Sequence, residues 1–292
     1  MRAYVTGASG FIGGHVVAQL RERGAEVRED FVDLSDSAGL DRAMRGCNAV
    51  FHLAALYSFD GNPLELRRVN VDGTRNVLAA ARWAGVGRVV HTSTCATCGP
   101  VPGRQATELD APPAWELSVP YKATKIAAER LAQEAAGEGM DVVIVNPTTP
   151  VGEGDRRPTP TGVMVRGVAG GRYRAYLGTT GVNLVDVRDV ARGHLLAHER
   201  GVAGEKYILG GEDMPLRDAF ALIAGLADRP RPRLRVPLAA ARAAAAAGLL
   251  NRHQVTLARL PAYFSWEKAR HELGYEPGPV PPALTRAIAD IR

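Results

Sequence analysis

Tyr121 and Lys125 are the two side chains of this 292-residue chain that are best suited to acid–base chemistry. They stand four residues apart, a spacing that places both on one face of a helix. A phenol ordinarily titrates near pH ~10, and a neighbouring ammonium group stabilises the phenolate. We therefore expect Lys125 to lower the pKa of Tyr121, so that Tyr121 acts as a general acid or base.

A glycine-rich segment near the N-terminus, Thr6–Gly13, lies between a predicted strand and a predicted helix. Gly7 allows a tight turn, Gly10 lets the backbone approach a pyrophosphate, and Gly13 allows close packing of the helix on the strand. The free N–H groups at the start of a helix favour anions. The segment therefore predicts a dinucleotide-phosphate site formed by Gly7, Gly10, Phe11, Ile12 and Gly13.

The segment after the first helix should decide which dinucleotide binds. We expect one strand over 25–32, because Asp33 already begins the segment that leads to the next helix. Parallel strands need a crossover of about a dozen residues, so a further strand does not fit and the sheet should lack its outer edge strand. Asp33 or Asp30 could bind the adenosine ribose and select NAD, whereas Arg28 could bind a 2′-phosphate and select NADP. All three could instead be surface residues, and Leu34 belongs to the same predicted contact segment.

The elements that position these residues alternate along the first half of the chain. We expect strands over 2–6, 49–53, 88–93 and 141–146, and helices over 11–24, 36–46, 64–84 and 119–137. This order predicts a parallel sheet with helices on both faces. Continuous apolar runs such as 142–145 are typical of strands that are covered on both faces. The expected fold class is α/β, with a doubly wound parallel Rossmann sheet.

The pattern changes after Pro147, where Gly, Pro, Thr and Arg cluster as in a loop over 152–162. Later elements are expected as strands over 182–187 and 206–209, and as helices near 188–200, 216–227, 238–250, 265–273 and 282–291. We assign residues 1–151 plus about 182–202 to a dinucleotide-binding Rossmann domain. Residues 152–181 plus about 203–292 are assigned to a smaller, mostly helical substrate-binding lobe.

Further motifs follow one another in a recognisable order: Phe51–Ala55, Asn70–Thr74, His91–Gly99 and Ser265–Tyr275. With these motifs the chain resembles, nearly from end to end, the extended short-chain dehydrogenase/reductase group of the NAD-dependent epimerase/dehydratase superfamily. The segments Val143–Gly152, Pro158–Gly162 and Tyr207–Glu212 make it most similar to the hopanoid-associated sugar epimerases, which are close to the dihydroflavonol-reductase-like enzymes.

The resemblance implies catalytic roles for three residues. Tyr121 would be the proton donor or acceptor, and Lys125 would lower its pKa and bind the nicotinamide ribose. Thr94, placed by counting back from Gly99, would hold the substrate oxygen, and Ser93 is the neighbouring candidate for that role. Asn70 would brace the fold.

The resemblance also implies contacts with the cofactor. The adenosine side would be lined by Leu53, Ala54 and Ala55, and the nicotinamide side by Asn146, Pro147 and Thr148. Ser93 and Asn146 are also candidates for substrate contacts, and two further residues join them. Cys98 stands where many relatives carry an aromatic or aliphatic residue, and Arg172, near the junction of the lobes, could meet an anionic substrate or simply be solvated. The stretch 248–261 looks shorter than in relatives, so the substrate lobe departs from the family pattern.

Two sequence features do not predict additional chemistry. Cys95 and Cys98 have the spacing of half a zinc site, but zinc needs about four ligands and the only other cysteine is Cys47, so we expect no metal and no disulfide. The run Arg229–Arg233 alternates with proline, which favours a solvated connector over a nucleic-acid-binding segment.

Composition agrees with a cytoplasmic enzyme. The net charge of +5 is mild, the N-terminus lacks the apolar core of a signal peptide, and the longest apolar stretch is too short to span a bilayer. We expect NAD(P)-dependent hydride transfer at a carbonyl or secondary alcohol of a sugar-like or secondary-metabolite substrate, by a ketoreductase or an epimerase. A homodimer is a possible assembly. The alternative is a non-redox enzyme or a cofactor-sensing regulator on the same fold.

Overall fold

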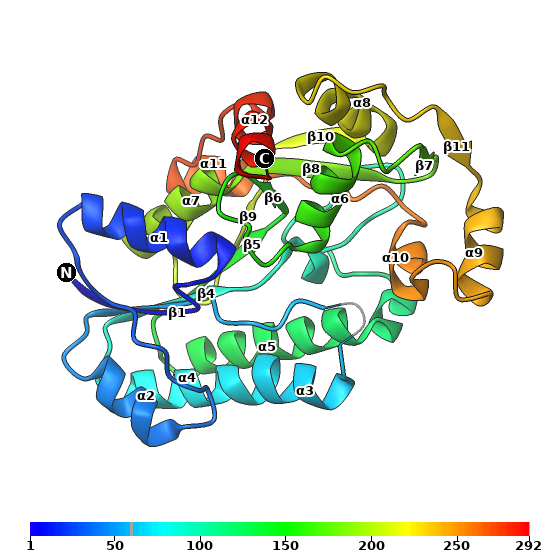
Figure 1. Ribbon diagram of the computed structural model, residues 1–292. Helices are drawn as coiled ribbons and strands as arrows, with labels where there is room; N and C mark the ends of the chain where they lie inside the picture. The colour runs from blue at the N-terminus through cyan, green and yellow to red at the C-terminus, as the bar shows by residue number, and fades with distance from the viewer. Residues whose placement is uncertain (59–60, 292) are drawn as a thin grey trace.

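The computed structural model describes residues 1–58 and 61–291 (Figure 1). Its centre is a six-stranded parallel sheet with the strand order β2-β1-β3-β4-β5-β9. The strands are β1 (Arg2–Thr6), β2 (Glu26–Arg28), β3 (Ala49–His52), β4 (Arg88–Thr92), β5 (Val142–Pro147) and β9 (Lys206–Leu209). The α/β class and the doubly wound parallel sheet predicted from the sequence are confirmed.

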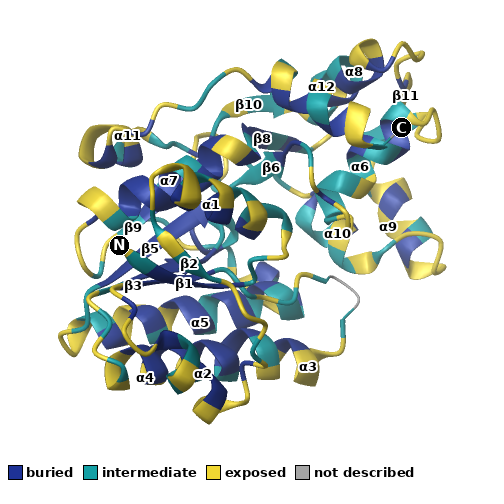
Figure 2. Cartoon of the chain, turned by 60° about the vertical axis from the view of Figure 1, so that its left-hand side comes forward, coloured by how far each residue is buried: buried dark blue, intermediate teal, exposed yellow. Residues whose placement is uncertain are grey.

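Helices cover both faces of this sheet. One face is covered by α1 (Phe11–Glu22) and α7 (Val187–Arg200), and the other by α2 (Ser37–Met44), α4 (Gly73–Trp83) and α5 (Pro120–Gly137). Strand residues alternate between the two cores. Val143 and Val145 face α1 and α7, whereas Val142 and Ile144 face the other helix layer. Burial on both faces explains the continuous apolar runs, and Figure 2 shows these strands buried between helices whose outer sides are exposed.

The sheet ends at β2, as expected for the loss of an outer edge strand. The pairing with β1 covers only Glu26–Arg28, so the strand is shorter than the expected 25–32. Beyond Arg28 the chain leaves the sheet, and the Tyr4 hydroxyl donates a hydrogen bond to the Asp30 carbonyl at 3.2 Å. The residues after Arg28 are therefore free to line a cavity.

The helix expected over 64–84 is interrupted by one wide turn. It consists of α3 (Pro63–Arg67), a π-helical turn over Arg68–Asp72, and α4. Within that turn the buried Asn70 side chain accepts from Leu56 N at 2.7 Å and donates to Leu56 O at 3.0 Å. It also donates to the Thr124 hydroxyl at 3.1 Å, so Asn70 braces α5 and the loop after β3, as expected.

The C-terminal part adds two small sheets and further helices. One sheet has the order β10-β8-β6 and the other pairs β7 with β11. The strands are β6 (Thr149–Val151), β7 (Ala175–Leu177), β8 (Gly181–Asp186), β10 (Glu212–Pro215) and β11 (Leu234–Val236). The helices are α6 (Pro160–Ala169), α8 (Leu216–Leu226), α9 (Leu238–Ala246), α10 (Arg252–Leu257), α11 (Glu267–Leu273) and α12 (Val280–Ile291).

The sheets pair strands from both predicted lobes. β8, expected in the Rossmann part, pairs with β6 and β10, whereas β9, expected in the substrate lobe, pairs with β5. Sheet membership depends on distant partners that local patterns do not specify. The lobe boundaries themselves stay a prediction. The last residues of the expected loop over 152–162 are helical instead. They belong to α6, which is capped by Thr159 and has Pro160 in its first turn.

Three buried histidines predict acid sensitivity. Burial lowers the pKa of His52 to about 3, that of His194 to about 4 and that of His91 well below 6.5. Below pH 6.5 the unfolded chain takes up protons that the folded chain does not, so stability falls with falling pH. We expect the free energy of unfolding to drop by up to roughly 4 kcal/mol between pH 7 and 5.5.

Urea titrations at several pH values measure this decline. The exposed His271→Gln variant should keep the decline unchanged. A stability that is flat between pH 7 and 5.5 would contradict the prediction.

No helix within 1–58 and 61–291 is long and apolar enough to cross a membrane.

Candidate active site

A cavity of about 250 Å³ opens at the carboxyl ends of the central strands. It brings together most of the residues that the sequence analysis selected: Gly7, Gly10, Phe11, Ile12, Gly13, Leu53, Ala55, Ser93, Thr94, Tyr121, Lys125, Pro147 and Thr148. The cavity combines the glycine-rich loop with the candidate acid–base pair, as a site for cofactor and substrate together requires.

A second cavity of about 590 Å³ continues from the first along the glycine-rich loop. Asp33, Leu34 and Ala54 lie in its lining. The two cavities share Gly7, Gly10, Leu53 and Ala55, so they form one extended site. The predicted adenosine contacts therefore lie at one end of this site and the predicted catalytic residues at the other.

The loop between β1 and α1 has the geometry of a phosphate cradle. Gly7 has φ +70°, and a Cβ atom there would lie 2.7 Å from the backbone nitrogen of Ala54. A Cβ atom on Gly13 would lie 2.1 Å from the carbonyl oxygen of Gly7, so both positions require glycine. The N-terminus of α1 receives no side-chain cap from Gly10. Its backbone N–H groups can therefore bind an anion, and the site fits a dinucleotide pyrophosphate.

The segment after β2 presents more acidic than basic groups to the second cavity. Its charged lining residues are Glu29, Asp30, Asp33, Glu65, Arg68 and Arg157. Hydrogen bonds from Ser35 lower the pKa of Asp33 and keep it a carboxylate. Arg28 is not among the described lining residues of either cavity. Its guanidinium donates to carbonyl oxygens at the end of α2, to Ala43 at 3.2 Å and to Arg45 at 3.3 Å.

Tyr121 lies near the start of α5, with its ring 4.5 Å from that of Tyr57. The expected lowering of its pKa is not found. Burial raises the pKa of Tyr121 well above 10, and the hydrogen bond with the Thr94 side chain only partly opposes this. The half-buried Tyr121 phenol is therefore protonated at neutral pH, and its hydroxyl can donate a proton into the cavity.

Lys125 follows one helical turn later and points into the same cavity. Its ammonium group donates to the Thr92 carbonyl at 2.8 Å, which fixes it against the end of β4. Burial lowers the pKa of Lys125 to about 8. It is the only charged side chain among the described lining residues of the 250 Å³ cavity.

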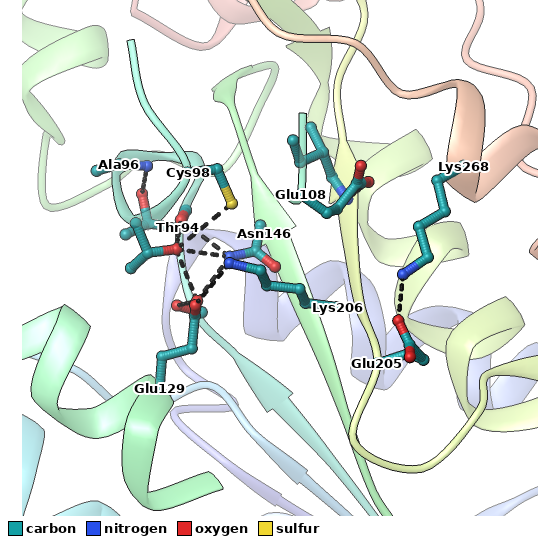
Figure 3. A network of polar contacts seen from close by, with 12 residues as sticks. Thr94, Ala96, Cys98, Glu108, Glu129, Asn146, Glu205, Lys206 and Lys268 are labelled. Atoms are coloured by element: carbon teal, nitrogen blue, oxygen red, sulfur yellow. Dashed lines mark hydrogen bonds and ion pairs between the residues drawn. The ribbon is translucent and has the colours of Figure 1, made fainter. Parts of the chain in front are cut away.

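A buried carboxylate, Glu129, holds the loop that carries Thr94. Its Oε2 atom accepts from the Ser93 hydroxyl at 2.5 Å, the Thr97 hydroxyl at 2.6 Å and the Asn146 amide at 2.8 Å. Lys206 on β9 donates to the other oxygen at 3.3 Å. Figure 3 shows Glu129, Asn146 and Lys206 pointing toward one another beneath this loop.

This network changes the interpretation of several candidates. Ser93 lines the cavity, but its hydroxyl is bonded to Glu129. Asn146 is fully buried and donates to the Thr94 carbonyl at 3.1 Å, so it supports the loop and is not among the cavity's described lining residues. Cys98 is equally buried and packs against Ala106 and Phe264. The structure brings neither of them into the site.

Arg172 is exposed beyond the end of α6 and is also not among the lining residues described for the two cavities. Sequence reasoning missed Tyr57, Arg68, Arg157 and Glu129. Only Glu129 had a usable signal, because it follows Tyr121 and Lys125 at the same spacing of four residues on one helix face.

Cys95 and Cys98 are free thiols. Within the described part of the chain, no three His, Cys, Asp or Glu side chains gather as a metal site would require.

Replacing Glu129 with glutamine should disturb the position of Thr94. The change removes the counter-charge of Lys206 in a buried setting, so we expect a loss of about 3 kcal/mol in stability. We also expect a fall of about 10-fold in kcat, since the loop that carries Thr94 would shift. Denaturant titration and kinetics measure both effects. The exposed Glu138→Gln, at the C-cap of the same helix, is the matched control, and equal behaviour of the two variants would contradict a positioning role for Glu129.

Comparison with known proteins defines the class to which this fold and site belong. The profile of the NAD dependent epimerase/dehydratase family matches residues 3–210. The chain therefore belongs to this family, as the sequence motifs predicted.

Individual relatives agree with this assignment. A Synechocystis protein named "Putative dihydroflavonol 4-reductase" is 42% identical over 259 residues, covering 80% of this chain and 75% of its own length. A Stigmatella aurantiaca 4-hydroxy-2-methyl-3-oxo-4-farnesyl-3,4-dihydroquinoline-1-oxide ketoreductase is 35% identical, covering 94% and 92%. The crystal structure of a DesIV double mutant, a dTDP-glucose 4,6-dehydratase from Streptomyces venezuelae with NAD and DAU bound, is 25% identical with a TM-score of 0.83, covering 99% and 96%.

Proposed function

We propose that this protein is an NAD-dependent oxidoreductase that reduces the carbonyl group of an uncharged ketone. The observation that carries the proposal is the convergence of Tyr121, Thr94 and Lys125 on a cavity that continues along a phosphate-binding loop. Family membership supports the cofactor class. The DesIV relative contains NAD, and two of the compared relatives are named as reductases.

The three side chains have separate tasks in this reaction. A bound nicotinamide dinucleotide would supply the hydride for the carbonyl carbon. The Thr94 hydroxyl hydrogen-bonds the carbonyl oxygen, and the protonated Tyr121 donates its proton to that oxygen as the alcohol forms. Lys125 holds the nicotinamide ribose and provides a positive charge near the phenolate that Tyr121 then becomes.

The charges of the site support NAD and an uncharged substrate. Four carboxylates and two guanidinium groups line the second cavity, a balance that opposes a 2′-phosphate. In the catalytic cavity Lys125 is already engaged by the ribose in this proposal. A substrate with a diphosphate would therefore lack a counter-charge among the described lining residues. The homodimer and the division into two lobes remain predictions from the sequence.

Mass spectrometry of the nucleotide that copurifies, together with calorimetric titration, tests the cofactor assignment. We expect NADH to bind at least about 10-fold more tightly than NADPH, a preference of about 1.4 kcal/mol, and dialysis to remove it. NAD that cannot be removed would favour an epimerase. Tighter binding of NADPH would contradict the assignment of the ribose site, and the absence of affinity for either would overturn the oxidoreductase proposal.

A further inference from the structure

Two stretches of the chain, 156–185 and 229–266, contain arginine but no acidic residue. Together they hold 12 of the 36 Lys and Arg residues and none of the 31 Asp and Glu residues. The rest of the chain, with 24 basic and 31 acidic residues, has the opposite net charge. The positive charge of this protein is therefore concentrated in part of its C-terminal half.

The structure joins these two stretches into one body. β7 pairs in parallel with β11, so that Ala175 lies opposite Leu234 and Leu177 opposite Val236. α9 and α10 pack against both strands through an apolar cluster that includes Ala241 and Val255. We call β7, β11, α9, α10 and their connections, residues 172–177 and 229–259, the basic tip. Figure 1 shows it at the end of the molecule away from α1 and α2.

The arginines of the basic tip are exposed and lack acidic partners. All nine are exposed: Arg172, Arg174, Arg229, Arg231, Arg233, Arg235, Arg242, Arg252 and Arg259. Across residues 1–58 and 61–291, none of the nine forms an ion pair with a carboxylate, whereas exposed arginines elsewhere, such as Arg21 and Arg23, do. Uncompensated guanidinium groups at this density produce a positive potential that attracts an anionic surface.

Exposed leucines lie among these charges. Leu234, between Arg233 and Arg235, is 65% exposed, and Leu249 and Leu250 at the turn from α9 to α10 are 77% and 46% exposed. Leu249, Leu250 and Arg252 also line one groove with Ser118. Figure 2 shows exposed residues along α9 and at its turn. Exposed leucine beside arginine suits a lipid headgroup boundary, where the cation meets phosphate and the apolar chain enters hydrocarbon.

We propose that the basic tip binds the surface of an anionic lipid bilayer. The leucines favour lipid over nucleic acid, because apolar side chains gain nothing from phosphate contacts alone. The run Arg229–Arg233, interpreted from sequence as a solvated connector, is then part of a docking surface. Arg259 stacks over Trp115 at 4.8 Å, in the short 3₁₀ helix Ala114–Ser118 that leads into α5. Docking would thus place the start of the catalytic helix near the bilayer.

Cosedimentation of the full-length protein with vesicles tests this proposal. We expect binding to phosphatidylcholine vesicles that contain phosphatidylglycerol, at least 10-fold weaker binding to phosphatidylcholine alone, and weakening by salt. The triple variant Arg231→Glu, Arg233→Glu, Arg235→Glu should lose at least 10-fold in binding. The triple variant Arg45→Glu, Arg67→Glu, Arg130→Glu makes the same charge change at exposed positions outside the tip and should bind within about 3-fold of wild type.

A second variant separates lipid from other anionic partners. Leu234→Ser with Leu249→Ser keeps all arginines and should weaken vesicle binding several-fold while leaving binding to duplex DNA unchanged. Equal loss in the two triple variants, equal binding to both vesicle types, or DNA binding as tight as vesicle binding would each overturn the proposal. Thermal unfolding confirms that each variant is folded. These readouts do not depend on the proposed catalytic function.

Discussion

Replacing Tyr121 with phenylalanine is expected to lower kcat by about 1,000-fold, within the range found for general acids. The ring stays in place against Tyr57, so the change removes only the hydroxyl that donates the proton and bonds the Thr94 side chain. The affinity for the dinucleotide should change by less than about 3-fold, because the phosphate cradle and Lys125 remain. Single-turnover kinetics and calorimetric titration measure the two quantities separately.

The Tyr57→Phe variant is the matched control for this prediction. It removes a phenol from the same cavity and keeps the ring contact with Tyr121. Its kcat should fall far less than that of Tyr121→Phe. Turnover that survives in Tyr121→Phe would remove Tyr121 from the proton transfer and with it the proposed mechanism.

Replacing Lys125 with methionine is expected to weaken both steps that depend on the cavity. We expect kcat to fall about 100-fold and the affinity for the dinucleotide to fall about 10-fold, because the Lys125 ammonium group provides the positive charge for both catalysis and binding. The Lys268→Met control removes an ammonium group that pairs with Glu205, away from the cavity. It should alter neither quantity by more than about 3-fold. An unchanged kcat and affinity in Lys125→Met would remove Lys125 from the site.

The pKa of Lys125 also predicts how kcat/KM depends on pH. The pKa of Lys125 is lowered to about 8, so its positive charge is present below that pH and is lost as the pH rises through 8. We expect kcat/KM of the wild-type enzyme to fall above pH 8, and the Lys125→Met variant to lack this limb. A limb that persists in the variant would belong to another group.

The parts of the site that follow from local spacing could be predicted from the sequence. Gly7, Gly10 and Gly13 must stand where a strand turns into a helix, and Tyr121 and Lys125 share one helix face whatever the tertiary structure is. The end of the sheet at β2 followed from a simple limit on crossover length. Each of these inferences needed only a few neighbouring residues.

Other features depended on contacts between distant segments. Asn146 ends an apolar strand, as a substrate-binding residue would, yet its amide turns to Glu129 and the Thr94 carbonyl. The residues that follow Arg28 line the second cavity, but the guanidinium group of Arg28 itself donates to backbone carbonyls at the end of α2. The strand expected over 182–187 forms, and its hydrogen-bonding partners place it in another sheet. In each case the sequence predicts that the residue or strand is there. It does not specify where the side chain points or which strand becomes the hydrogen-bonding partner.

Transfer of deuterium from NADH labelled at C4 of the nicotinamide into an uncharged ketone, followed by mass spectrometry of the alcohol, tests whether this protein transfers hydride to a carbonyl carbon with Tyr121 as the proton donor. The ketones would be drawn from a panel of flavonoid-like and alkyl-substituted compounds. We expect one deuterium at the carbinol carbon of the product with the wild-type protein, and about 1,000-fold slower labelling with Tyr121→Phe. Product that forms without the label, or at the same rate in the variant, would contradict the proposed hydride transfer.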